Sequence, residues 1–385
     1  MPESLTPELN ELRDRVQAFV DDDLRPLEGA LGDDDAVPVP DETRRRVRER
    51  SRALGLFQMT QPRAFGGSEA GPLALTVVRE TLAAANLRVA QYVFGPGPGV
   101  LAAVTGELGE AYLAPLLRGE KSGAWAFTEP ASTPRPTWAR RDGDELVISG
   151  RKAYVSGGAS ADFYSVLVNV EEGASGPGGT AMVIVDRATP GVTIDRTFHS
   201  MEGGSHVELG FADVRVPVSR VVGKIGEGMP RALGNISHMR LAMTAQATGL
   251  AMWVTDYVER HITSPHRSGV RLGDREGVRL PYADMRIGTY AARAMLYRTA
   301  RIVDSASRED EVMNEVMATK VFCTEHAGCA VDTAVQLVGG QALIVGHPLE
   351  RRYREVRSMR IAEGASDLLR LNVARGRIEF HSGRL

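Results

Sequence analysis

The chain has 385 residues, 43% of them hydrophobic, and a formal net charge of −3 at pH 7. A chain of this size buries a large core and forms two or three subdomains. Its small net charge gives no electrostatic reason to expect binding to nucleic acid or to an anionic membrane. Residues Met1–Leu5 lack the basic region and apolar run of a signal peptide. The most apolar long stretch, 241–254, is too short to span a bilayer. We therefore expect a soluble, cytoplasmic protein.

The two cysteines, Cys323 and Cys329, lie six positions apart in a helical pattern. Neither has a neighbouring Cys or His at metal-ligand spacing, so the sequence predicts no zinc site and no other metal site. We expect a reduced, buried pair of thiols.

The first 120 residues show helical patterns. Thr6-Pro7-Glu8 predicts a helix start, because it combines a hydroxyl cap, a proline in the first turn and an acidic residue near the positive end of the helix dipole. Apolar residues then recur at helical spacing. Further helices are predicted over 41–54 and around 73–85.

From about Ser122 the pattern changes to short runs of β-branched and aromatic residues separated by turns. Such runs predict a small antiparallel β domain, and long helical patterns return from Met229 onward. The predicted domains are therefore 1–121 (helical), 122–228 (β) and 229–385 (helical). The runs that predict strands are 146–148, 153–155, 163–170, 181–185 and 207–211.

Three segments carry the most specific signal: Trp125–Pro130, Lys152–Gly158 and Ile361–Ser366. In this order, they resemble the flavin-contacting segments and the catalytic carboxylate of the acyl-CoA dehydrogenase family. Several weaker matches extend the resemblance over nearly the whole chain. It implies an α+β fold with an N-terminal helical domain, a middle antiparallel β domain and a C-terminal four-helix bundle. The weaker matches are 106–120, 211–217, 336–340 and 354–357.

The resemblance implies FAD as cofactor. It places Phe127 and Thr128 at the pyrimidine edge of the flavin, in a segment that begins with Trp125. It places Tyr154 against the ring face and Ser156 near N5. The family more often has Trp and Thr at these two positions, and an aromatic ring and a hydroxyl preserve the chemistry. The alternative is a Tyr packed in a β core and a Ser in a turn.

Glu363 is the catalytic base that the resemblance implies. In the family this glutamate removes the α-proton of an acyl thioester while hydride leaves the β-carbon for flavin N5. Desolvation by substrate and flavin would raise the pKa of the carboxyl group and make it a stronger base. Some relatives place the acid at the position of Met239, where methionine cannot serve. The alternative is a solvated glutamate at a helix start.

The resemblance also implies residues at the edges of the site. Arg240 falls at the base of the family's substrate cavity, although a structural salt bridge is the alternative, and Ala362 and Gly364 flank the base. In the family's dimer, the segment around Gln336 touches the neighbour's adenine diphosphate end. A simple helix end at Gly339-Gly340 is the alternative. The expected contacts from this segment are Gln336, Gly339 and Gly340, with Arg267 as a displaced arginine from the preceding loop.

Four positions depart from the family pattern. Pro134 replaces a serine that contacts flavin or substrate, Pro265 begins a loop without the usual aromatic residue, and Ala365 replaces a flavin-contacting threonine. These changes predict weaker flavin retention or other anchors. Ala362 replaces a tyrosine, which opens roughly a hundred cubic ångströms. We therefore expect a bulky acyl group, branched or cyclic, carried on coenzyme A or on an acyl-carrier protein as in secondary-metabolism relatives.

The sequence thus favours an FAD-dependent α,β-dehydrogenase of an acyl thioester. It would pass electrons to an electron-transfer flavoprotein or a similar acceptor and form a homodimer or homotetramer. Two alternatives remain. One is a flavin monooxygenase of the same fold, which would need externally reduced flavin and oxygen. The other is a flavin-free binding or assembly subunit.

Overall fold

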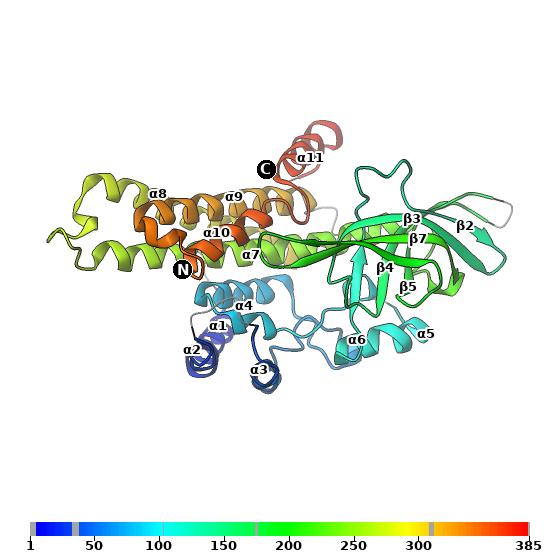
Figure 1. Ribbon diagram of the computed structural model, residues 1–385, viewed down its shortest axis with the longest axis horizontal. Helices are drawn as coiled ribbons and strands as arrows, with labels where there is room; N and C mark the ends of the chain where they lie inside the picture. Colours follow the sequence, from blue (N-terminus) through cyan, green and yellow to red (C-terminus); the bar gives the residue numbers. More distant parts are fainter. Residues whose placement is uncertain (1–4, 33–37, 103, 174–175, 308–311, 384–385) are drawn as a thin grey trace. The chain divides into compact units, whose positions relative to one another are not determined.

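The computed structural model describes residues 5–32, 38–102, 104–173, 176–307 and 312–383. Residues 1–4, which include most of the segment examined for a signal peptide, lie outside these ranges. The chain divides into two compact units, whose helices and strands are drawn in Figure 1. The helical unit comprises Met1–Met59, Glu69–Phe94 and Ile236–Leu385, and the sheet unit comprises Thr60–Ser68 and Gly95–Asn235.

The N-terminal helices begin where their capping residues predict. The Thr6 hydroxyl accepts a hydrogen bond from the Leu9 N–H at 3.4 Å, and Pro7 occupies the first position of α1. A Pro also opens α4, and the helices predicted over 41–54 and 73–85 are confirmed. The bounds are α1 Pro7–Phe19, α2 Arg25–Gly29, α3 Asp41–Ala53 and α4 Pro72–Ala85.

The C-terminal part of the helical unit is a bundle. Helices α8 and α9 pack along each other, and α9 also contacts α10 and α11 (Figure 1). A buried carboxylate joins this bundle to α4, because Glu80 accepts hydrogen bonds from Arg293 at 2.8 and 3.0 Å and from the Tyr297 hydroxyl at 2.7 Å. The bounds are α7 Gly228–Thr263, α8 Glu276–Ser305, α9 Met313–Val338, α10 Pro348–Met359 and α11 Ser366–Phe380. Within the described ranges, none of the helices combines the length and apolar character needed to cross a membrane.

The sheet unit is built on one curled sheet in the order β1-β4-β2-β3-β7-β6, with β5 paired to β4. The predicted antiparallel pairing holds for β2–β3, β3–β7, β4–β5 and β6–β7, whereas β1 and β2 each run parallel to β4. The strands are β1 Gly123–Ala126, β2 Trp138–Asp142, β3 Glu145–Ser156, β4 Phe163–Val170, β5 Gly179–Asp186, β6 Val192–His199 and β7 Ser205–Pro217, with the short helices α5 Gly106–Leu108 and α6 Ala114–Arg118.

The apolar runs located four of these strands and missed three. β1 has only four residues, β2 consists mostly of polar residues, and β6 exposes most of its side chains, so none of the three shows a long hydrophobic run. The prediction of two buried thiols is wrong for one of them: Cys323 is buried and Cys329 is exposed, and both are free. Six residues span one and two-thirds turns of an α-helix, so the two side chains point in different directions.

Candidate active site

The proposed base lies in the tight connection between α10 and α11. Glu363 has a backbone φ of 55° and Gly364 one of 107°, both in the left-handed region. A Cβ at position 364 would lie 2.9 Å from Leu369 Cδ2, closer than real side chains approach. Only glycine therefore fits after Glu363 without a rearrangement. Backbone in this region is held only where its surroundings over-determine it.

Two buried cations hold this connection. Arg240 on α7 donates from Nε to the Glu363 carbonyl oxygen at 2.9 Å. Lys320 on α9 donates from Nζ to the next carbonyl oxygen, that of Gly364, also at 2.9 Å. Lys320 has no exposed surface and Arg240 is 7% exposed. Charged donors make stronger hydrogen bonds to carbonyls than neutral donors, so these two contacts fix successive peptide groups of the loop.

The environment of the Glu363 carboxyl group makes it a stronger base than an exposed glutamate. The side chain is half-buried, and this burial raises its pKa, while the charges of Arg240 and Lys320 act in the opposite direction. Burial of the Lys320 ammonium group, together with the nearby charge of Arg240, lowers the pKa of Lys320 to about 8. Below that pH two cations therefore face one carboxylate and oppose the rise in the pKa of Glu363 that burial causes.

A further ion pair ties the start of the loop to α9. Arg360 pairs with Glu325 at 2.7 Å, and its carbonyl oxygen accepts a hydrogen bond from the Ser366 N–H at 3.0 Å. Between these anchors Ala362 is exposed. Met239, at the position where some relatives carry the base, is 45% exposed. The structure thus brings Glu363, Gly364 and Arg240 together.

In the sheet unit, a buried lysine that sequence analysis missed organises the Thr128-Glu129-Pro130 segment. Lys152 is 1% exposed, donates to the Phe127 carbonyl oxygen at 2.9 Å and forms an ion pair with Glu129. Glu129 also accepts hydrogen bonds from the N–H and hydroxyl groups of Thr137, at 3.1 and 3.0 Å. Glu129 is therefore an internal anchor of the segment. The sequence did contain a signal for this pair. Lys152 stands in a predicted strand beside apolar residues, and a charge that is buried there needs a partner of opposite charge.

The exposed face of β3 carries Tyr154 and Ser156. The Ala153 N–H donates to the Thr128 carbonyl oxygen at 3.0 Å, which places Thr128 next to Tyr154. The Tyr154 ring is 63% exposed and packs edge-on against Phe198, with ring centroids 4.9 Å apart. The alternative of a tyrosine packed in the β core is therefore wrong.

The Ser156 hydroxyl has a neighbour that the sequence did not reveal. Its Oγ lies 2.9 Å from Nδ1 of His206, which is its cross-strand partner on β7. This pairing depends on the register between β3 and β7, and that register includes a shift between Lys152 and Val155. Sequence spacing alone cannot locate such a shift.

The residues of the sheet unit fit a flavin. Trp125 Nε1 and Thr133 Oγ1 are buried and have no hydrogen-bond partner among the described residues. Buried polar atoms are almost always hydrogen-bonded in folded proteins, so two such atoms in one segment are expected where a ligand completes the bonds. The exposed Tyr154 ring supplies an aromatic face and the exposed Thr128 supplies a hydroxyl group. These are the kinds of contact that an isoalloxazine ring and its polar edge require.

The other expected flavin contacts lie on the surface of the helical unit. Arg267 is exposed in the connection between α7 and α8, and Gln336 is exposed on α9. Gly339, with φ 82°, forms the C-cap of α9. The alternative of a helix end at this position is thus confirmed, and it leaves a role in binding an anion open.

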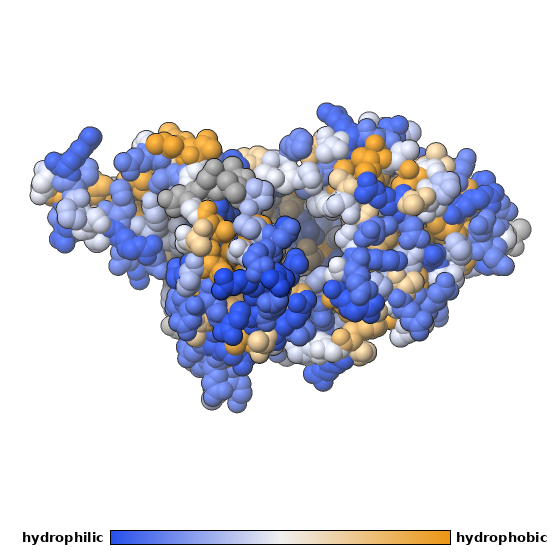
Figure 2. Space-filling view, turned by 60° about the horizontal axis from the view of Figure 1, so that its bottom comes forward, coloured by the Kyte–Doolittle hydropathy of each residue, from blue (hydrophilic) through white to orange (hydrophobic). Residues whose placement is uncertain are grey.

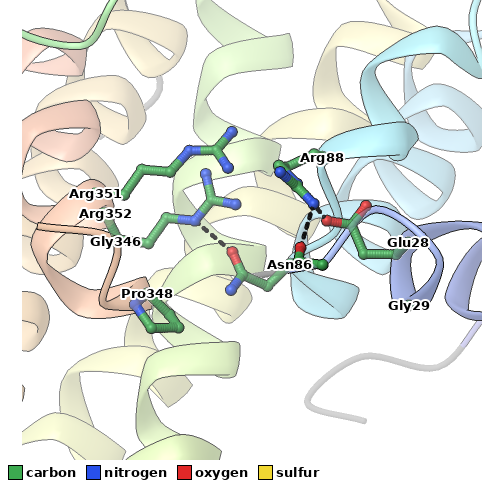
Figure 3. A pocket seen from close by; sticks show the side chains of 9 residues that line it. Glu28, Gly29, Asn86, Arg88, Gly346, Pro348, Arg351 and Arg352 are labelled. Atoms are coloured by element: carbon green, nitrogen blue, oxygen red, sulfur yellow. Dashed lines mark hydrogen bonds and ion pairs between the residues drawn. The ribbon is translucent and has the colours of Figure 1, made fainter. Parts of the chain in front are cut away.

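The helical unit also contains an arginine-lined cavity of about 250 Å³. The side chains that converge there are shown in Figure 3. Arg352 donates to Asn86 and pairs with Glu355, and Arg88 pairs with Glu28 at 2.7 Å. These bonds link α10 and α2 to the segment that follows α4, so the guanidinium groups hold these elements together, and no predicted site residue lines this cavity.

Comparison with known proteins finds matches to one family over nearly the full length of the chain. Models of the acyl-CoA dehydrogenase N-terminal, middle and C-terminal domains match residues 6–120, 124–214 and 226–378. The chain is 29% identical to an acryloyl-CoA reductase (NADH) of Anaerotignum propionicum, over 97% of this chain and 95% of that protein. It is also 29% identical to a cyclohexane-1-carbonyl-CoA dehydrogenase of Geobacter metallireducens, over 84% of this chain and 86% of that protein.

A solved structure of similar fold also matches the chain over most of its length. A putative acyl-CoA dehydrogenase from Mycobacterium smegmatis has a TM-score of 0.80 and 28% identity, and the match covers 96% of this chain and 98% of that one. The fold and the site thus define an oxidoreductase that acts on CH–CH groups, of the class of FAD flavoproteins. The chain belongs to the acyl-CoA dehydrogenase family. The predicted fold class is confirmed.

Proposed function

We propose that the protein catalyses α,β-dehydrogenation of an acyl-CoA thioester, with Glu363 as the base that removes the α-proton. The observation that carries this proposal is a half-buried glutamate with a raised pKa on a loop held by two buried cations. An α-C–H is a weak acid, so its removal requires a base whose pKa lies near the working pH. Burial raises the pKa of Glu363 in this direction, and the hydrogen-bonded loop backbone keeps the carboxylate in a fixed orientation.

Bound FAD supplies the acceptor for the hydride that leaves the β-carbon. Trp125, Phe127, Thr128, Tyr154 and Ser156 would hold the flavin from the sheet unit. The unpaired indole N–H and the exposed aromatic ring support this assignment. Glu129 and Lys152 keep the segment in place from inside the sheet unit. Arg267, Gln336, Gly339 and Gly340 are the proposed contacts to the flavin of a neighbouring subunit.

We propose a branched or cyclic acyl group. Ala362 leaves an exposed methyl beside the base, where the family usually has an aromatic wall. A relative at 29% identity is named for a cyclic acyl-CoA, and a short/branched chain specific acyl-CoA dehydrogenase from Rattus norvegicus is also 29% identical. Electrons would pass to an electron-transfer flavoprotein or a similar acceptor. The acyl group would be carried on coenzyme A or on an acyl-carrier protein.

The proposal is tested by anaerobic mixing of the flavin-loaded protein with a panel of straight, branched and cyclic acyl thioesters. A suitable thioester should bleach the flavin absorbance and yield the α,β-unsaturated product. Glu363→Gln should slow the bleaching by at least about a thousandfold while FAD stays bound, since only the base is lost. Glu276→Gln, at an exposed position in the first turn of α8, is the matched control and should bleach like the wild type. Bleaching at an undiminished rate in Glu363→Gln would exclude Glu363 as the base.

A further inference from the structure

Lys320 is a buried cation whose position packing alone does not explain. It lies on α9, has no exposed surface, and donates to the Gly364 carbonyl oxygen at 2.9 Å. A charge in such a place costs free energy unless hydrogen bonds and opposite charges compensate it. An apolar side chain such as methionine would fill the same volume without that cost. The charge is therefore expected to have a function beyond filling space.

The charged groups that face Lys320 come from three elements. Arg240 on α7 opposes its charge, whereas Glu363 on the α10–α11 loop and Glu325 on α9 itself favour it. Glu325 is already paired with Arg360 at 2.7 Å. Glu363 is therefore the acidic group whose charge acts on both Arg240 and Lys320 and raises the pKa of each.

We propose that Lys320 is a positioning residue for Glu363 and forms, with Arg240, a two-point clamp on the carbonyl groups of residues 363 and 364. The inference rests on the proposed role of Glu363 as base and extends it to a residue on a different helix. Two fixed carbonyls in succession determine the orientation of the two peptide groups that meet at the Cα of Gly364. They therefore hold Gly364 in its left-handed conformation, with φ at 107°, and fix the peptide group that follows Glu363, which limits the direction of the Glu363 side chain.

The clamp also sets the proton affinity of the base. Burial raises the pKa of Glu363, and the charge of Lys320 lowers it again. Removal of this charge therefore raises the pKa further, so the protonated, inactive form persists to higher pH. A purely structural lysine would affect stability without moving the pH profile.

The test compares Lys320→Met and Lys320→Gln with Arg293→Met. Arg293 is a cation of the same unit whose side chain is 15% exposed and which pairs with the buried Glu80, so its loss should also destabilise the bundle but leave the loop untouched. In both Lys320 variants the acidic limb of kcat/KM should move upward by roughly half a pH unit or more. In Lys320→Met, kcat should fall about tenfold or more with a smaller change in KM, because the loop loses its alignment. Gln keeps a donor without a charge and should lose less in kcat.

A second readout does not need flavin. Carbodiimide reacts with protonated carboxyl groups, so the pH dependence of labelling at Glu363, read by peptide mass spectrometry, reports its titration directly. The labelling midpoint should move upward in both Lys320 variants and stay in place in Arg293→Met. A folded Lys320 variant whose midpoint and pH profile both match the wild type would overturn the clamp.

The two proposals fail in different ways. If Glu363→Gln still bleaches at the wild-type rate, the role of the base is wrong. If Glu363→Gln is inactive but the Lys320 variants keep the wild-type profile, the base stands and the clamp alone is wrong.

Discussion

Glu363 is the residue on which the account depends, and its properties come from three neighbours. Gly364 permits a turn that a side chain would strain, and Arg240 and Lys320 fix the carbonyl groups of Glu363 and Gly364, on either side of the Gly364 Cα. The sequence pointed to Glu363 and Arg240 through their resemblance to a family. It did not reveal Lys320, because a lysine in the middle of a helical pattern carries no sign of burial.

The raised pKa of Glu363 predicts a specific pH dependence. The base is active only when ionised, so the rate of flavin reduction by a thioester should fall as the pH drops through this raised pKa, above the ordinary 4.5 of a glutamate. The measurement is the reduction rate in single turnovers between pH 5 and pH 9. A rate that stays constant down to pH 5 would mean that no group with a raised pKa acts as the base.

At the scale of elements, the sequence predicted the helices and the strands with apolar runs because burial of one face leaves a periodic pattern. It missed β1, which is short, β2, which is mostly polar, and β6, which is largely exposed. It also could not locate the neighbours that strand register creates. The Ser156–His206 contact and the Lys152–Glu129 pair join positions 50 and 23 residues apart, and only the folded sheet brings them together.

The Lys152–Glu129 ion pair predicts a link between the core of the sheet unit and cofactor retention. Lys152→Met leaves Glu129 half-buried without its cation and should cost about 3 kcal/mol of unfolding free energy, near the lower end for broken buried pairs. Lys152 holds the residues on either side of Thr128, so its loss should loosen this segment. The FAD content after gel filtration should therefore also fall. Lys224→Met, at an exposed position, is the control and should change neither value. Full FAD retention in a destabilised Lys152→Met protein would show that the ion pair does not contribute to flavin binding.

At the scale of the whole molecule, apolar patches interrupt a largely hydrophilic surface (Figure 2). Leu280, Ile287 and Tyr290 form an exposed stripe at helical spacing on α8, each with about two-thirds of its surface accessible. The run Leu343-Ile344-Val345 is also exposed, at 70, 63 and 84%. Contiguous patches of exposed apolar residues mark interaction surfaces, whereas single ones do not. We therefore propose that the chain assembles as a homodimer or homotetramer. Sedimentation equilibrium should find a mass of at least twice 41.6 kDa, and a monomer at micromolar concentration would contradict this.

The most direct test of the central claim is the isotope effect on flavin reduction with a thioester deuterated at the α-carbon, at the β-carbon or at both. If Glu363 removes the α-proton as hydride leaves the β-carbon, each substitution should slow single-turnover bleaching by about twofold or more, and the doubly labelled substrate should be slowest. The same α-deuterated substrate should exchange no label with water in Glu363→Gln. Bleaching that is insensitive to deuterium at the α-carbon, at a pH where that carboxyl group is ionised, would contradict the account.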